Sequence, residues 1–142
     1  MSPYEILIRR LLPRHLADPN YMCVVLVCGG RDYGDRRRVF MVMDMILGDW
    51  RAAGHADSAL MIVHGGARGA DALADAWARS RGITVRPEPA DWNEHGKAAG
   101  PIRNAAMLRD YEPALVVAFK GGNGTAHMMK IARAAGVKVE EY

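Results

Sequence analysis

Cysteine is scarce in this chain of 142 residues, which contains only two, Cys23 and Cys28. Both belong to one apolar run. On an extended strand, residues five apart face opposite sides and lie too far from each other to form a disulfide. A scaffold held together by disulfides is therefore excluded, and we expect a protein of the reducing cytoplasm.

Long apolar runs are missing as well. No stretch approaches the roughly 20 apolar residues that a helix needs to cross a bilayer, so we expect no membrane association. We also expect no secretory signal peptide, because Arg9, Arg10 and Arg14 interrupt the N-terminal segment.

Aromatic residues and excess charge are both low. Phe, Trp and Tyr together make up 7% of the chain, and the formal net charge is only +3. A small positive charge suits an anionic small molecule, whereas a surface that coats nucleic acid needs more cations and more stacking side chains. Single-stranded nucleic-acid binding therefore ranks last among the functions considered.

The chain does contain a regular alternation of apolar runs and helical patterns. Residues 1–20 predict an N-terminal helical extension, and residues 21–142 predict one domain. The expected strands are 21–28, 59–63, 83–86, 114–119 and 137–139, and the expected helices are 35–50, 71–80, 101–110 and 125–135. This order is typical of an α/β, Rossmann-like three-layer domain, with a mostly parallel sheet of about five strands and helices on both faces.

Three of the expected strands end in glycine-rich polar segments, at residues 29–34, 64–71 and 121–125. The carboxyl ends of parallel strands meet at one edge of the sheet, where ligands bind at the point of strand-order reversal. Glycine lets the backbone approach a ligand closely, and the helix expected after residues 121–125 would direct its positive end there. The sequence therefore predicts a pocket for a phosphorylated small molecule.

The glycine segment at 121–125 differs from two common phosphate-binding loops. No Lys-Ser/Thr pair follows it, as a Walker loop requires. Its glycine spacing is not that of the dinucleotide fingerprint, and no strand after it could supply a ribose-binding acid about 20 residues on. The alternative is a tight turn with Thr125 near a helix cap.

Charged side chains at the strand ends are candidate ligand contacts. Arg31 could hold a phosphate and Asp32 could accept from ribose hydroxyls, although the two could instead pair with each other and cap the next helix. Asp71 could likewise meet a sugar or cap a helix. Arg103 lies in the first turn of an expected helix, where the helix dipole disfavours a cation, which hints at a ligand role. The predicted ligand-binding residues are Gly29, Gly30, Arg31, Asp32, His64, Gly65, Gly66, Arg68, Asp71, Trp92, Arg103, Asn104, Gly121, Gly122, Asn123, Gly124 and Thr125.

Acid–base residues are harder to assign. Asp32, Glu94 and His64 are candidates, but a single histidine at a strand end is more often a hydrogen-bonded structural residue. Trp92 could stack on a base or simply anchor the long loop at residues 87–100. His95 and His127 share no metal-ligand spacing with each other or with the cysteines, so we predict neither a metal nor a cofactor.

Taken together, these segments resemble the SLOG superfamily, named for the SMF/DprA and LOG (Lonely Guy) proteins, and within it the YspA-like branch. The matching stretches are Val27–Tyr33, Val63–Asp71, Asp91-Trp92 with Gly100–Asn104, and Gly121–Thr125. They occur in the family's order and extend over about residues 22–139. The resemblance implies a Rossmann-like domain whose glycine loops hold a nucleotide or a nucleotide-derived ligand such as NAD or ADP-ribose.

The resemblance also implies a second possibility, because Lonely Guy enzymes hydrolyse the bond between base and ribose 5'-monophosphate. They use a glutamate that follows their Pro-Gly-Gly-x-Gly-Thr motif. Here Lys120 stands at the proline position and Met128 at the glutamate position. A methionine cannot take a proton, so the same hydrolysis by the same group is not expected.

We therefore expect a nucleotide-ligand-binding domain that acts as a sensor and forms a homodimer. Its ligand would be a phosphorylated ribonucleoside, with ADP-ribose-like molecules preferred. A nucleotide N-glycosidase that takes a carboxylate from another loop is the alternative, so the sequence leaves open whether the protein is an enzyme.

Overall fold

The computed structural model describes residues 22–142. The N-terminal extension predicted at residues 1–20 lies outside the described residues. Within the described part of the chain, no helix combines the length and the apolar character needed to cross a lipid bilayer.

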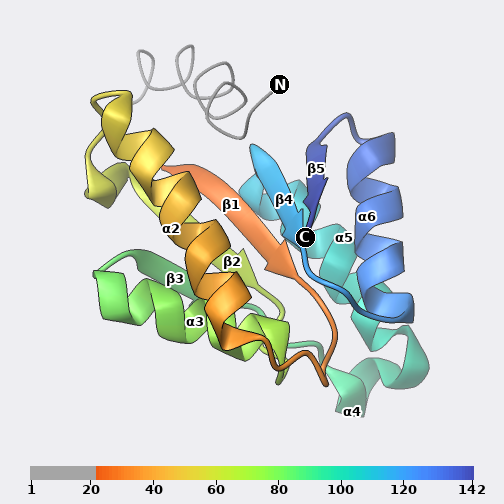
Figure 1. Ribbon diagram of the computed structural model, residues 1–142. Coiled ribbons are helices and arrows are strands. Elements are labelled where there is room, and N and C mark those ends of the chain that lie inside the picture. Colours follow the sequence, from red (N-terminus) through yellow and green to blue (C-terminus); the bar gives the residue numbers. More distant parts are fainter. Residues whose placement is uncertain (1–21) are drawn as a thin grey trace.

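A five-stranded parallel sheet forms the centre of the domain (Figure 1). The strand order is β3-β2-β1-β4-β5, and all four pairings are parallel. The strands are β1 (Cys23–Cys28), β2 (Leu60–His64), β3 (Thr84–Pro87), β4 (Leu115–Ala118) and β5 (Lys138–Glu141). The predicted Rossmann-like α/β class is confirmed.

Helices cover both faces of the sheet. The helices α2 (Arg36–Ala52) and α3 (Ala70–Arg81) lie on one face, and α5 (Ala99–Tyr111) and α6 (Asn123–Ala134) lie on the other (Figure 1). Because successive residues of a strand point to opposite faces, β1 contributes to two cores. Val25 packs with Trp77 on the α2–α3 side, whereas Leu26 packs with Met107 and Met128 on the α5–α6 side.

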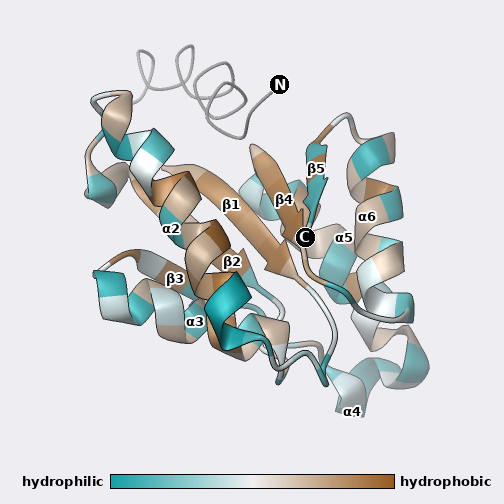
Figure 2. Cartoon of the chain, in the orientation of Figure 1, coloured by the Kyte–Doolittle hydropathy of each residue, from teal (hydrophilic) through white to brown (hydrophobic). Residues whose placement is uncertain are grey.

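Burial on both faces explains the unbroken apolar runs of the central strands. Figure 2 shows β1 and β4 in brown, while the covering helices alternate between brown and teal. The edge strands β3 and β5 are more exposed than the central strands. Apolar burial in the central strands therefore stabilises the sheet, and polar loops can follow the carboxyl ends of the strands without loss of core contacts.

The segment at residues 87–100, predicted as a loop, contains short helical turns. The four-residue helix α4 (Trp92–His95) is capped by Asp91, whose Oδ1 accepts from the backbone N–H of Glu94 at 3.0 Å. A turn of 3-10 helix at Gly96–Ala98 then leads into α5. Elements this short contain less than two turns, so they leave no hydrophobic period in the sequence.

The first turn of α2 carries an unusual charge. Arg36, Arg37 and Arg38 follow one another there and are exposed, and no acidic residue lies in the turn. Asp35 caps the helix by accepting from the backbone N–H of Arg38 at 3.0 Å. Cations at a helix N-terminus add to the positive end of the dipole instead of offsetting it.

Candidate functional site

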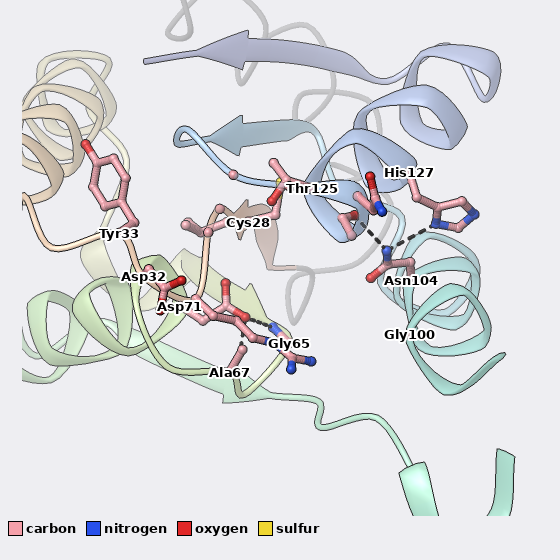
Figure 3. A pocket seen from close by; sticks show the side chains of 18 of the residues that line it. Cys28, Asp32, Tyr33, Gly65, Ala67, Asp71, Gly100, Asn104, Thr125 and His127 are labelled. Atoms are coloured by element: carbon pink, nitrogen blue, oxygen red, sulfur yellow. Dashed lines mark hydrogen bonds between the residues drawn. The ribbon is translucent and has the colours of Figure 1, made fainter. Parts of the chain in front are cut away.

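The loops that follow β1, β2 and β4 meet at the carboxyl edge of the sheet. The chain leaves β1 towards α2 on one face and leaves β4 towards α6 on the other, so a crevice opens between these neighbouring strands. A cavity of about 1060 Å³ occupies this crevice (Figure 3). Its walls come from the three loops together with residues of α3, α4, α5 and α6.

Close backbone contacts hold the loops together. The N–H of Gly30 donates to the carbonyl of Lys120 at 3.0 Å, and the N–H of Ala70 donates to the carbonyl of Gly30 at 3.1 Å. A Cβ on Gly29 would lie 2.4 Å from that of Ala70, and one on Gly121 would lie 2.6 Å from the backbone nitrogen of Gly30. These glycines are needed for contact between the loops themselves.

Gly122 and Gly124 are different, because a Cβ on either would meet no atom within 4 Å. Both line the cavity at the start of α6, where Gly122 is the N-cap. Among the described residues, the backbone N–H groups of residues 122–125 donate to no protein acceptor. Such free N–H groups, together with the helix dipole, favour an anion.

Two arginines from separate elements line the same cavity. The Arg103 guanidinium is fixed, because its Nη1 donates to the carbonyl of Gly65 at 2.5 Å and its Nε donates to Oδ1 of Asn104 at 3.0 Å. Burial lowers the pKa of Arg103, and the nearby charge of Arg31 lowers it further against the opposing effect of Asp71. The two cations lie close enough to repel each other, which an anion between them would relieve.

Gly65 explains how Arg103 reaches this position. A Cβ on Gly65 would lie 2.3 Å from Nη1 of Arg103, so only glycine leaves room for the guanidinium. Gly65, predicted as a ligand contact, therefore provides the space that the Arg103 side chain occupies.

Asp71 is the buried carboxylate of the cavity wall, with 5% of its surface exposed. Its Oδ2 accepts from the N–H groups of Gly65 at 3.1 Å and Ala67 at 3.3 Å, as the dashed lines in Figure 3 show. Burial raises the pKa of Asp71, and the two backbone hydrogen bonds and the charge of Arg103 only partly offset this. The side chain holds the β2–α3 loop, and the N-cap position of α3 is occupied by Gly69.

Asn104 joins α5 to α6 in the cavity wall (Figure 3). Because its Oδ1 accepts from Arg103, its Nδ2 faces α6, where it donates to Nδ1 of His127 at 3.2 Å and to the carbonyl of Gly124 at 3.3 Å. His127 therefore accepts at Nδ1 and carries its proton on Nε2 when neutral. His127 was considered from the sequence only as a metal ligand, although its position soon after the glycine segment at residues 121–125 places it near this wall.

His64 lies outside the cavity wall, and both of its ring nitrogens are engaged. The N–H of Gly66 donates to Nδ1 at 3.0 Å, so Nε2 carries the proton and donates to Oδ2 of Asp75 at 2.7 Å. This geometry favours the structural role over acid–base chemistry.

The other acid candidates are exposed. The Asp32 side chain is 96% exposed at the rim, where it lies 3.6 Å from Arg68, which is also exposed. Glu94 points to solvent beside His95.

Most of the predicted ligand-binding set is brought together in the cavity wall. The residues that line it are Gly29, Gly30, Arg31, Asp32, Gly65, Asp71, Trp92, Arg103, Asn104, Gly121, Gly122, Asn123, Gly124 and Thr125. The wall does not include His64, Gly66, Arg68 or Glu94. The ligand roles predicted for His64, Gly66 and Arg68 and the acid–base role considered for Glu94 stay predictions, as do the ligand roles of the lining residues.

The wall also contains side chains that were not predicted as ligand contacts. Lys97 and Lys120 add positive charge, and Tyr33 and Cys28 add apolar surface. Burial, reinforced by Asp71, raises the pKa of the Cys28 thiol to about 12, so it is not a nucleophile at neutral pH. Within residues 22–142, no group of three or more His, Cys, Asp and Glu side chains is placed to hold a metal ion.

Comparison with known proteins gives three similarities. The sequence matches the family described as the YspA, cpYpsA-related SLOG family over residues 23–95. The Gene 61 protein of Mycobacterium phage D29 is 41% identical over 125 residues, which cover 83% of this chain and 94% of that protein. The crystal structure of the C-terminal domain of PF1911 hydrogenase from Pyrococcus furiosus covers 87% of this chain and 93% of that chain at 14% identity, with a TM-score of 0.45.

The family match begins at the first residue of β1 and ends at the last residue of α4. It therefore takes in two of the three loops that meet at the cavity, and it spans more than half of the chain. The chain belongs to the YspA, cpYpsA-related SLOG family.

Proposed function

We propose that this domain binds a nucleotide or a nucleotide-derived ligand, of the ADP-ribose or nucleoside phosphate class, and acts as a sensor of it. The free N–H groups at the start of α6, which line the same cavity as the guanidiniums of Arg31 and Arg103, carry this proposal. In the proposed complex, these groups surround a phosphate.

The rest of the wall suits the remaining parts of such a ligand. Asp71 lies on the same side as Arg103 and can accept from ribose hydroxyls, while Trp92 offers a half-exposed ring to a base. A cavity of about 1060 Å³ has room for a ligand of dinucleotide size.

Calorimetry with AMP and ADP-ribose tests the proposal. Gly122→Val places a branched side chain over the free N–H groups, so we expect affinity to fall at least tenfold, or roughly 1.4 kcal/mol. Gly48→Val is the matched control, because Gly48 also has open space around it but lies on α2. Equal affinity in the two variants would argue against the phosphate position, and absence of any binding would argue against the function.

An N-glycosidase that cleaves a nucleotide is the second candidate, supported by one observation. Asp71 combines burial, a raised pKa and a place in the cavity wall, which is typical of acid–base residues. Met128, at the position of the Lonely Guy glutamate, is buried in the core between α6 and the sheet. Release of base from AMP or NAD that disappears in Asp71→Asn but persists in Asp32→Asn would favour this candidate.

A further inference from the structure

The guanidinium of Arg31 lies over the indole ring of Trp92, 5.2 Å from the ring centroid. Arg31 belongs to the turn after β1, and Trp92 is the first residue of α4, so the contact joins two walls of the cavity. The indole is 48% exposed in spite of this contact. A large aromatic surface at a cavity mouth is thus partly covered by one cation.

Arg31 is held by little else. Among the described residues, no carboxylate or carbonyl accepts from its guanidinium, and the adjacent carboxylate of Asp32 lies against Arg68 instead. Arg103, by contrast, donates to two backbone carbonyls and to Asn104. The site therefore contains one fixed arginine and one that can move.

The backbone that carries the ring is held independently of Arg31. Asp91 caps α4, the helix that begins at Trp92, by accepting from the backbone N–H of Glu94. Movement of Arg31 therefore breaks none of the hydrogen bonds that hold this turn.

An exposed cation–π contact is weak compared with a bidentate hydrogen bond from a guanidinium to a phosphate. A phosphate bound between the start of α6 and Arg103 would therefore attract Arg31 away from the indole ring. The uncovered ring face is then free to stack on a planar group, whereas a ligand without an anionic group has to displace the cation unaided.

We propose that Arg31 and Trp92 act together as one specificity element, which admits a base to the indole only when the same ligand supplies an anion for Arg31. The element selects nucleoside phosphates over free nucleosides and over phosphates that lack a base. This inference rests on the proposed function and adds to it the coupling between its two recognition steps.

Quenching of tryptophan fluorescence by acrylamide reports this coupling. Trp50 and Trp77 are 1% and 0% exposed, so Trp92 is the tryptophan that acrylamide reaches in the folded protein. We expect ribose 5-phosphate to increase quenching because it removes Arg31 from the ring, and AMP to decrease quenching because its base covers the ring. Calorimetry on the same samples measures binding separately.

The variants make the test specific. In Arg31→Ala, quenching should be high without ligand and unchanged by ribose 5-phosphate, and affinity for AMP should fall at least about tenfold towards that for adenosine. Arg133→Ala removes an exposed arginine at the far end of α6 and should behave as the unmodified protein.

The possible outcomes distinguish a failure of the Arg31–Trp92 coupling from a failure of the proposed nucleotide binding. Binding of ribose 5-phosphate with no change in quenching, or unchanged quenching in ligand-free Arg31→Ala, would overturn the coupling and leave the function standing. Failure of AMP, adenosine and ribose 5-phosphate all to bind would overturn both.

Discussion

At the scale of single residues, Asp71 combines two opposing contributions to stability. Its hydrogen bonds to the N–H groups of Gly65 and Ala67 stabilise the β2–α3 loop, whereas burial of its charge destabilises the fold. The raised pKa of Asp71 indicates that burial outweighs the hydrogen bonds and the nearby charge of Arg103. A neutral side chain of the same shape would keep the first contribution and remove the second.

We therefore expect Asp71→Asn to be at least as stable as the unmodified protein at neutral pH. The folded-state pKa is raised, so the unfolded chain loses the Asp71 proton at lower pH than the folded chain does. Stability of the unmodified protein should fall as pH rises from about 4, the ordinary pKa of the carboxyl, through the raised value, and Asp71→Asn should lack this fall. Urea denaturation across this range measures the difference.

Asp71→Ala serves as the comparison, because it removes charge and hydrogen bonds together. It leaves the buried N–H group of Gly65 and the partly buried N–H group of Ala67 without an acceptor, and it should cost about 1–3 kcal/mol. Should Asp71→Asn and Asp71→Ala lose stability equally, the balance described for Asp71 would be wrong.

At the scale of elements, the glycines after β4 divide into two kinds. Gly121 lies against the backbone of the β1 loop and against Thr125, while Gly124 in α6 has open space around it. Gly121 thus allows the two loops to contact each other, whereas Gly124 leaves open space at the cavity.

The two kinds of glycine should respond oppositely to the same change. Gly121→Ala forces backbone atoms of two loops apart and should lower the free energy of unfolding by about 1–3 kcal/mol. Gly124→Ala meets no atom and improves helix propensity, so stability should be unchanged or rise by up to about 1 kcal/mol, while nucleotide affinity falls. Urea denaturation with calorimetry distinguishes these effects, and a fully stable Gly121→Ala would contradict the close contact.

This division marks the limit of what the sequence could predict about the site. The three loops and their shared edge were predictable, because they follow from apolar runs, glycines and the geometry of parallel sheets. The contact of Gly121 with Gly30 depends on residues about ninety positions apart, and no local pattern records it. The helix α4 was missed because four residues show no period.

At the scale of the whole molecule, the cavity joins the two helical layers. Its walls draw on α3 from one face of the sheet and on α5 and α6 from the other, with β1 and β4 between them. The confirmed fold class, read from strand–helix alternation alone, was enough to place this edge. The orientation of Asn104 and His127 was not predictable, because it depends on how α5 and α6 pack.

A ligand in this position touches both halves of the domain and should stabilise the whole. With free AMP at about a hundred times its Kd, the free energy of unfolding should rise by about 2.7 kcal/mol. Thermal denaturation followed by circular dichroism would show this as a melting temperature several degrees higher, with adenosine at the same concentration producing a smaller rise. A melting temperature that AMP leaves unchanged at saturation would show that binding is not specific to the folded state.

The three arginines at the start of α2 bear on how quickly a ligand arrives. They lie next to Asp35 and Tyr33, which line the cavity, and they add to the positive end of the helix. This positive charge should attract an anion before the anion reaches the cavity wall. The association rate should therefore be raised by electrostatic steering and should fall as ionic strength rises. Rapid capture at low concentration would suit a protein that must register a scarce signal.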